Sequence, residues 1–340
     1  MYHLAKLSNG LTIATAAMPF MASVSVGIWV GVGARHEAAE LNGACHFIEH
    51  MLFKGTARRT AEAISQAVEG VGGYLNAVTT EETTCFHARA HADQFEVLLD
   101  VLADMVLRSK FAPAELVKER EVIKEEILMY LDQPQDHVQE VLNATLWPGQ
   151  PLGRPITGDE KTLAALTRPK LLAYLKNNYL ANNTVIVVAG NVTHRRAVQA
   201  VSRYARFFTQ GPPPPCAPAR DDQRAPRVSL STRKVEQTQL ALGIRTCSRH
   251  DARQSALRLL NTLLGENMSS RLFQVIREER GLAYSIYSTP SFYADTGDLV
   301  ISAGLDTENL PQTLRLIMRE LKRFTETPPS AAEQIGRAHV

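Results

Sequence analysis

The sequence predicts an α+β fold made of two structurally related domains, each a mainly antiparallel sheet with helices packed on it. Three observations indicate this class. Segments with the periodicities of strands and of helices alternate along the chain, a proline-rich tract divides it, and the order of elements restarts after that tract. The length of 340 residues and the hydrophobic share of 45% suit about two ordinary domains with sizeable cores.

The N-terminal region predicts β-structure. Strands at 4–8 and 11–14 flank Asn9-Gly10, a pair that favours a two-residue hairpin turn because both positions tolerate positive φ. Residues 24–32 alternate branched apolar side chains with Ser, Gly and Trp, which is the pattern of a half-buried strand.

Helical periodicity dominates the next part of the chain. We expect helices at about 42–54, 60–70, 93–109, 113–131 and 135–146. A strand pair over about 72–91 separates the second helix from the third. A further helix beginning near Pro169, which suits a first turn, precedes a strand at 184–189.

A proline-rich tract marks the domain boundary. Four consecutive prolines lack amide donors and favour an extended, semi-rigid spacer. We therefore expect a first domain over 1–210, a linker over 211–226, and a second domain over 227–340.

The pattern after the linker repeats the pattern before it. Arg249-His250-Asp251 matches Arg35-His36-Glu37, and an apolar helix follows each triplet. We interpret the halves as a degenerate internal duplication, with chance similarity of two α+β stretches as the alternative. The second half lacks counterparts of 113–206, and residues 334–340 resemble a translated sequencing adapter, so we expect this domain to be artificially truncated.

Composition excludes several classes of protein. Lys and Arg total 37 and Asp and Glu total 35, and a net charge of +2 argues against a nucleic-acid partner. No apolar run is long enough to span a membrane, and the N-terminus shows no signal pattern. The four cysteines form no CxxC pair, which favours reduced thiols and a cytoplasmic location.

The strongest functional signal is an HxxEH motif in the helix at 42–54, for which Asn42 is the expected N-cap. At about 100° per residue His46, Glu49 and His50 share one helix face. Histidines at i and i+4 can direct two ring nitrogens at one metal ion, with the glutamate beside its open position. The alternative is a helix whose histidines are satisfied by hydrogen bonds.

The helix at 113–131 offers a further ligand. A catalytic zinc ion takes three protein ligands, so one must come from outside the motif. Glu119 and Glu126, seven residues apart, fall at the edge of the apolar stripe, where carboxylates are costly unless paired or bound to a cation. A surface helix with i,i+4 ion pairs is the alternative, and it accounts for Glu121 and Glu125 better than for the other two.

On these residues the sequence resembles the pitrilysin/insulinase-type zinc peptidases, or inverzincins, and within them the mitochondrial-processing-peptidase-like branch with bacterial members. The resemblance implies one Zn²⁺ per chain held by His46, His50 and Glu126, Glu49 as general base, and a supporting catalytic role for Glu119. It also implies a zinc metalloendopeptidase that hydrolyses extended, unfolded peptides or presequences.

Further segments carry the resemblance to substrate-binding regions. Residues 72–77 look like the strand on which substrate is added, which implies that Asn76 and Ala77 contact it. Residues 269–285 look like the region that supplies Arg277 and Tyr284. Without the family these segments predict an ordinary edge strand, a solvated arginine and a core tyrosine.

The second half lacks the motif. The helix equivalent to the HxxEH helix carries leucines at 260–264, so only the first domain can bind zinc. We expect a peptide substrate, with Glu81 and Glu82 favouring basic peptides, and a homodimer or a heterodimer with a related subunit. A non-proteolytic subunit of the same fold and a zinc hydrolase of non-peptide substrates are the alternatives.

Overall fold

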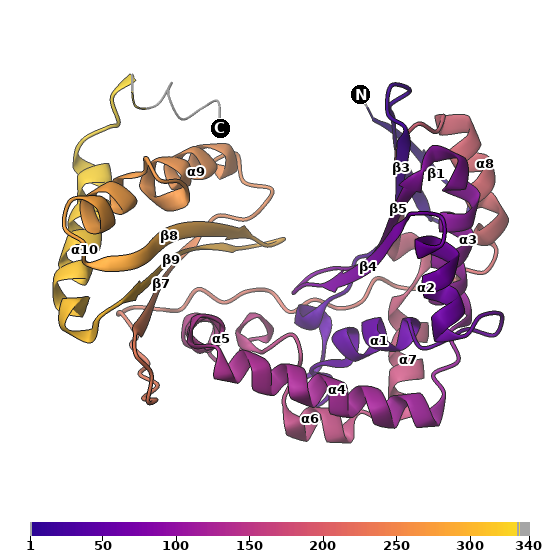
Figure 1. The fold of residues 1–340 in the computed structure, drawn as a ribbon, viewed down its shortest axis with the longest axis horizontal. Coiled ribbons are helices and arrows are strands. Elements are labelled where there is room, and N and C mark those ends of the chain that lie inside the picture. Colours follow the sequence, from indigo (N-terminus) through magenta and orange to yellow (C-terminus); the bar gives the residue numbers. More distant parts are fainter. Residues whose placement is uncertain (1, 332, 334–340) are drawn as a thin grey trace. The chain divides into compact units, whose positions relative to one another are not determined.

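The computed structural model describes residues 2–331 and 333 (Figure 1). The chain divides into two compact units, the first made of Met1–Ile127 and Arg154–Ala217 and the second of Leu128–Gly153 and Pro218–Val340. This division differs from the contiguous 1–210 domain, because residues 128–153 belong with the second unit. The chain passes finally from the first unit to the second at 217–218, inside the expected linker.

The first unit contains a six-stranded sheet in the order β1-β2-β6-β3-β5-β4. Among its neighbouring pairs only β2 and β6 run parallel, so the sheet is mainly antiparallel as predicted. Strand β4 lies at one edge. The strands are β1 (His3–Lys6), β2 (Thr12–Ala17), β3 (Ser23–Val30), β4 (Tyr74–Thr79), β5 (Thr84–His91) and β6 (Thr184–Gly190).

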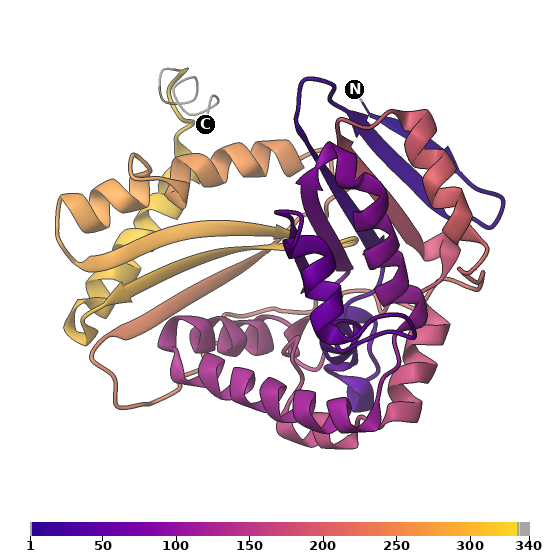
Figure 2. The same ribbon diagram turned by 45° about the vertical axis from the view of Figure 1, so that its right-hand side comes forward.

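Helices cover this sheet on the face where its alternating apolar residues point. Helices α2, α3 and α8 lie side by side on it (Figures 1 and 2), and α1 packs against β4 and α7. The valines of β3 are fully buried in the resulting core. The helices are α1 (Ala44–Leu52), α2 (Ala61–Glu69), α3 (Phe95–Arg108), α6 (Glu160–Ala165), α7 (Arg168–Asn178) and α8 (His194–Ala205), together with most of α4 (Pro113–Asp132).

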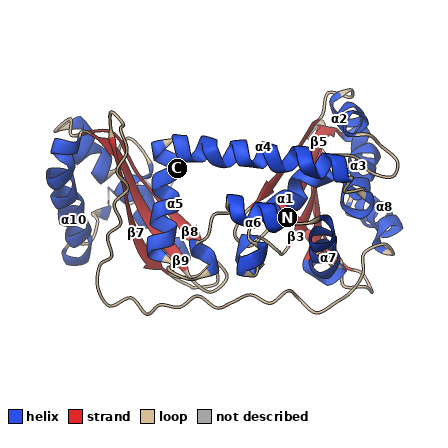
Figure 3. Ribbon diagram, turned by 90° about the horizontal axis from the view of Figure 1, so that it is seen from below, coloured by secondary structure: helices blue, strands red, loops and turns tan. Residues whose placement is uncertain are grey.

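The second unit contains a three-stranded antiparallel sheet in the order β7-β9-β8. Helix α5 (Pro134–Leu146) packs on β7 (Figure 3), where a Cβ at Gly243 would lie 3.1 Å from the side chains of Leu142 and Leu146. Glycine therefore permits this close approach. The other elements are β7 (Thr238–Thr246), α9 (Gln254–Asn261), two π-helical segments (Thr262–Glu266 and Phe273–Glu278), β8 (Ala283–Phe292), β9 (Gly297–Leu305) and α10 (Leu310–Glu326).

The two units share an order of elements, which supports the predicted duplication. A strand, helical segments, a strand pair and a helix follow one another as β3-α1-α2-β4-β5-α3 in the first unit and as β7-α9-β8-β9-α10, with the π-helical segments, in the second. The sheet orders β3-β5-β4 and β7-β9-β8 correspond. Residues 334–340, on which the expected truncation rests, lie outside the described residues. No helix in the described part of the chain is both long and apolar enough to cross a bilayer.

Candidate metal centre

A buried carboxylate accepts hydrogen bonds from backbone N–H groups at the start of helix α1. Its N-cap is Gly43 at φ +91°, one residue later than predicted, because a left-handed backbone at this point suits glycine. Glu37 accepts hydrogen bonds from the backbone N–H groups of Gly43 and Cys45, at 2.8 and 2.7 Å, and from Asn42 Nδ2 at 3.0 Å. These bonds satisfy amides at the start of the helix that have no intrahelical partner. Glu37 thus fixes the direction in which α1 enters the site.

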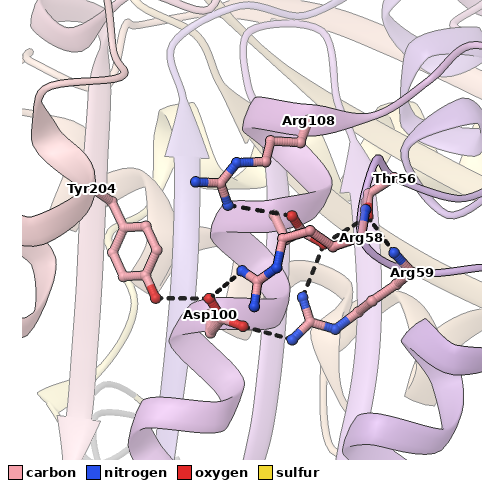
Figure 4. A network of polar contacts seen from close by, with 7 residues as sticks. Thr56, Arg58, Arg59, Asp100, Arg108 and Tyr204 are labelled. Atoms are coloured by element: carbon pink, nitrogen blue, oxygen red, sulfur yellow. Dashed lines mark hydrogen bonds and ion pairs between the residues drawn. The ribbon is translucent and has the colours of Figure 1, made fainter.

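The segment after α1 is tied to α3 by a polar network (Figure 4). Thr56 Oγ1 and Arg59 Nη1 donate to the same oxygen of fully buried Asp104, at 2.6 and 2.9 Å, and Arg108 contacts its other oxygen at 3.3 Å. Arg59 also pairs with Asp100 at 2.5 Å. This network holds the end of α1 in place, because the anchored residues follow it directly in the chain.

Three potential ligands converge between α1 and α4. Glu126 Oε2 lies 3.5 Å from His46 Nε2 and 3.6 Å from His50 Nε2. Their ligand atoms lie within 4.8 Å of one another, the one such cluster among the described residues. Donor atoms bound tetrahedrally at zinc–ligand distances lie about 3.3–3.6 Å apart. The predicted ligand set therefore has the donor types and spacing that fit one zinc ion.

The two imidazoles differ in their electrostatic surroundings. Burial and the nearby charge of His50 outweigh Glu126 and lower the pKa of His46 to about 4, so its ring is neutral at neutral pH. Burial also acts to lower the pKa of His50, but interactions with Glu126 and Glu119 outweigh it and raise that pKa. A metal ion binds neutral imidazole, so it displaces protons more from His50 than from His46.

The Glu49 carboxylate contacts both the edge strand and the charges of the ligand cluster. Thr79 Oγ1, at the end of β4, donates a hydrogen bond to Glu49 Oε2. Burial raises the pKa of Glu49, although the bond from Thr79 and the charge of His50 act to lower it. A partly buried carboxylate with a raised pKa beside a metal cluster is suited to accept a proton.

Glu119 contacts one of the candidate ligands, His50. It is 4% exposed, and its Oε2 lies 3.2 Å from His50 Nδ1 while its Oε1 lies 2.7 Å from Lys54 Nζ. A carboxylate on the outer nitrogen of a ligating histidine fixes the tautomer and orientation of the ring. Glu119 is therefore placed to position His50, and its supporting catalytic role stays a prediction.

The predicted substrate residues fall in both units. Asn76 and Ala77 lie on β4, where the Ala77 N–H donates to Asn76 Oδ1 at 2.8 Å. In the second unit the Arg277 guanidinium lies 5.5 Å from the ring centroid of Tyr284, which is 74% exposed rather than part of a core. Contact of these four residues with substrate stays a prediction.

Glu82 is not a solvated surface charge. Its carboxylate is buried and pairs with Arg35 at 2.7 Å, so it gives no support to the expected preference for basic peptides, which stays a prediction. A charge neutralised inside the unit exerts little pull on a ligand outside it.

Three residues of the site were not predicted from the sequence. Lys54 follows His50 by four positions and so continues the spacing of His46 and His50, a signal that could have revealed it. Thr79 and Glu37 gave no such signal, because their contacts depend on how separate segments pack.

The fold and site together define a class, the metal-dependent hydrolases with two histidines, one glutamate and a second glutamate beside them. The family model "Insulinase (Peptidase family M16)" matches residues 12–160, and "Peptidase M16 inactive domain" matches 165–334. The chain belongs to peptidase family M16, the insulinase family. The second match agrees with the absence of the motif from the second half.

Curated relatives are similar over nearly the whole chain. An uncharacterized zinc protease of Mycobacterium tuberculosis is 40% identical over 330 residues, which cover 96% of this chain and 75% of that protein. The uncharacterized zinc protease YmxG of Bacillus subtilis is 38% identical, covering 93% of this chain and 77% of that one.

Solved structures share the fold. A protease from Helicobacter pylori superposes with a TM-score of 0.92 at 21% identity, over 98% of this chain and 82% of that chain. The peptidase M16 inactive domain from Pseudomonas fluorescens gives a TM-score of 0.89 at 22% identity, over 98% and 81%.

Proposed function

We propose that the protein is a zinc-dependent endopeptidase that hydrolyses extended, unfolded peptides. The observation that carries this proposal is the convergence of His46, His50 and Glu126 on one point, with Glu49 adjacent on the same helix. The relatives are named zinc proteases, and the donor set here suits that metal.

His46, His50 and Glu126 would hold one zinc ion. Such an ion supplies Lewis acidity, which polarises a peptide carbonyl and makes water more acidic. His46 presents a neutral ring at neutral pH because its pKa is about 4. Glu119 holds the outer nitrogen of His50, which leaves Nε2 to face the metal.

Glu49 acts as the general base. The hydrogen bond from Thr79 occupies Oε2, which leaves Oε1 to take a proton from the attacking water. The proton then passes to the amine released when the peptide bond breaks. A pKa raised by burial brings the base closer to the operating pH, where general-base catalysis is most effective.

The edge strand β4 is the proposed docking site for substrate. A peptide that adds a strand to a sheet must be extended, which favours unfolded segments over folded proteins. At Ala77 the substrate would replace the Asn76 side chain as the acceptor of the backbone N–H. Arg277 and Tyr284 are proposed to orient the peptide, and assembly as a dimer is a further proposal.

The direct test combines metal analysis with cleavage. The purified full-length protein should contain about one zinc ion per chain and cleave members of an unfolded peptide library. Chelation should abolish cleavage and added Zn²⁺ should restore it, while the molar mass in solution reports the oligomer. A folded, zinc-loaded protein that cleaves no peptide would instead favour a non-proteolytic subunit or a hydrolase of other substrates.

A further inference from the structure

We propose that Lys54 is a positioning residue of the metal centre. Its ammonium group holds the Glu119 carboxylate, and that carboxylate holds the His50 imidazole in the orientation that directs Nε2 toward Glu126. The inference rests on the proposed function in that it concerns how one of the zinc ligands is aimed.

The contacts form a continuous chain of three residues. Lys54 Nζ lies 2.7 Å from Glu119 Oε1, and Glu119 Oε2 lies 3.2 Å from His50 Nδ1. His50 Nε2, on the opposite side of the ring, lies 3.6 Å from Glu126 Oε2. Each carboxylate oxygen of Glu119 therefore has its own partner.

The Glu119 carboxylate is held in one orientation because both of its oxygens have a partner. The Glu119 side chain is 5% exposed, so little water is available to replace a lost contact. A buried carboxylate is costly unless it is paired and hydrogen-bonded. With the Lys54 contact removed, the carboxylate would turn toward whatever donor or solvent remains. The His50 ring would then lose the restraint on its outer nitrogen.

The backbone of Lys54 is itself well placed to hold the group. The Lys54 N–H donates to the Met51 carbonyl at 3.1 Å as α1 ends, and Gly55 follows at φ +104°. The Gly55 carbonyl accepts from the Lys110 N–H at 3.1 Å, just before the network of Figure 4 ties Thr56 to Asp104. Because the backbone is anchored on both sides of Lys54, the Lys54 ammonium group is held beside Glu119.

The contact from a carboxylate to the outer ring nitrogen is found at His50 and not at His46 among the described residues. Nδ1 of His46 is buried and has no hydrogen-bond partner among the described residues. Of the two imidazoles, only that of His50 therefore has its outer nitrogen restrained by another side chain. On α4, Lys118 pairs with Glu115 at 2.8 Å, but its side chain is 67% exposed. Lys118 therefore offers a matched control, a solvent-exposed lysine–glutamate pair on the same helix.

The test measures zinc affinity by competition with a chelator of known affinity, using the full-length protein and Zn²⁺ alone. Removal of an outer-shell partner of a metal ligand weakens binding by roughly 10–100-fold, and Lys54→Met, which removes the partner of such a residue, should weaken zinc binding by up to that factor. Lys54→Arg, which keeps the positive charge, should recover part of the loss. Lys118→Met should bind zinc like the wild type. In a Glu119→Gln background, Lys54→Met should add little further loss.

A second readout needs no metal. In the metal-free protein at fixed pH, the ¹⁵N chemical shifts of the His50 ring should change in Lys54→Met and stay unchanged in Lys118→Met. Circular dichroism confirms that each variant is folded, and Lys54→Gln serves as a second variant should Lys54→Met unfold. Wild-type zinc affinity together with unchanged His50 shifts in a folded Lys54 variant would overturn the inference. A wild-type protein that binds no zinc would contradict the proposed function, and the His50 shifts would still decide the role of Lys54.

Discussion

The hydroxyl group of Thr79 donates a hydrogen bond to the carboxylate of Glu49, which joins the last residue of β4 to helix α1. The strand proposed to bind the peptide and the residue proposed to take the proton are therefore coupled through one contact. A peptide docked along β4 would lie in a fixed relation to the base.

Replacing Thr79 should change the pH dependence of catalysis. The hydrogen bond acts to lower the pKa of Glu49, which burial raises. Without it the pKa rises further, so Thr79→Val should move the acidic limb of the kcat/KM profile to higher pH. Thr79→Ser keeps the hydroxyl and should retain the wild-type profile. Identical acidic limbs in Thr79→Val and the wild type would show that the contact does not act on the base.

Glu49→Gln should separate metal binding from catalysis. The amide cannot accept the proton, and general-base catalysis contributes roughly 10²–10⁴-fold to rate. We expect kcat to fall by about that factor while the zinc content stays at the wild-type level, because Glu49 is not a ligand. Substantial turnover by the zinc-loaded variant would assign the base elsewhere.

Neighbouring glutamates on α4 should respond differently to the same substitution. Glu126→Gln should weaken zinc binding by more than the roughly 10–100-fold expected for an outer-shell residue, because it removes a charged ligand. Glu125 is exposed one residue earlier, and Glu125→Gln should leave zinc affinity unchanged. Equal affinities in the two variants, measured by chelator competition, would remove Glu126 from the ligand set.

The network around Asp104 should contribute strongly to stability. Asp104→Ala leaves Thr56 and Arg59 without their shared acceptor inside the unit. Breaking a buried ion pair costs about 3–5 kcal/mol, so the free energy of unfolding should fall by about that amount. Asp93→Ala, which removes a surface pair with His91, should cost about 0–1 kcal/mol. Denaturant titrations that give similar losses for both would contradict the prediction.

Acid should remove the contribution of Asp100. Burial acts to raise its pKa, but hydrogen bonds from Arg58, Arg59 and Tyr204 outweigh burial and lower the pKa to about 2. A carboxyl whose folded-state pKa lies below its unfolded value stabilises the fold above that unfolded value, about 4. The stability difference between wild type and Asp100→Asn should therefore be constant above about pH 4 and shrink as the pH falls to about 2. A difference independent of pH over that range would refute the pairing.

Local periodicity made much of the site predictable. His46 and His50 share a face because they lie four residues apart on one helix, and Glu119 and Glu126 lie two turns apart on another. The structure places all four together, as the helical faces and the family resemblance implied. The duplication was also detectable, because the Arg-His-acid triplets precede equivalent helices.

Contacts between separate segments were not predictable in this way. Thr79 reaches Glu49 only because β4 packs beside α1, and no spacing in the sequence encodes that approach. From the sequence we expected Glu82 to be a surface charge, but its carboxylate is buried and pairs with Arg35 from a distant segment. Residues 128–153 fall in the second unit because α5 packs on β7, although the sequence continues from the first unit without a break.

The central claim is that two histidines from α1 and a glutamate from α4 bind one zinc ion. An anomalous difference map at the zinc edge, from crystals of the zinc-loaded full-length protein, tests it most directly. We predict a single strong peak about 2.0–2.2 Å from His46 Nε2, His50 Nε2 and a carboxylate oxygen of Glu126. A zinc peak held by other residues, or none at this cluster, would contradict the assignment.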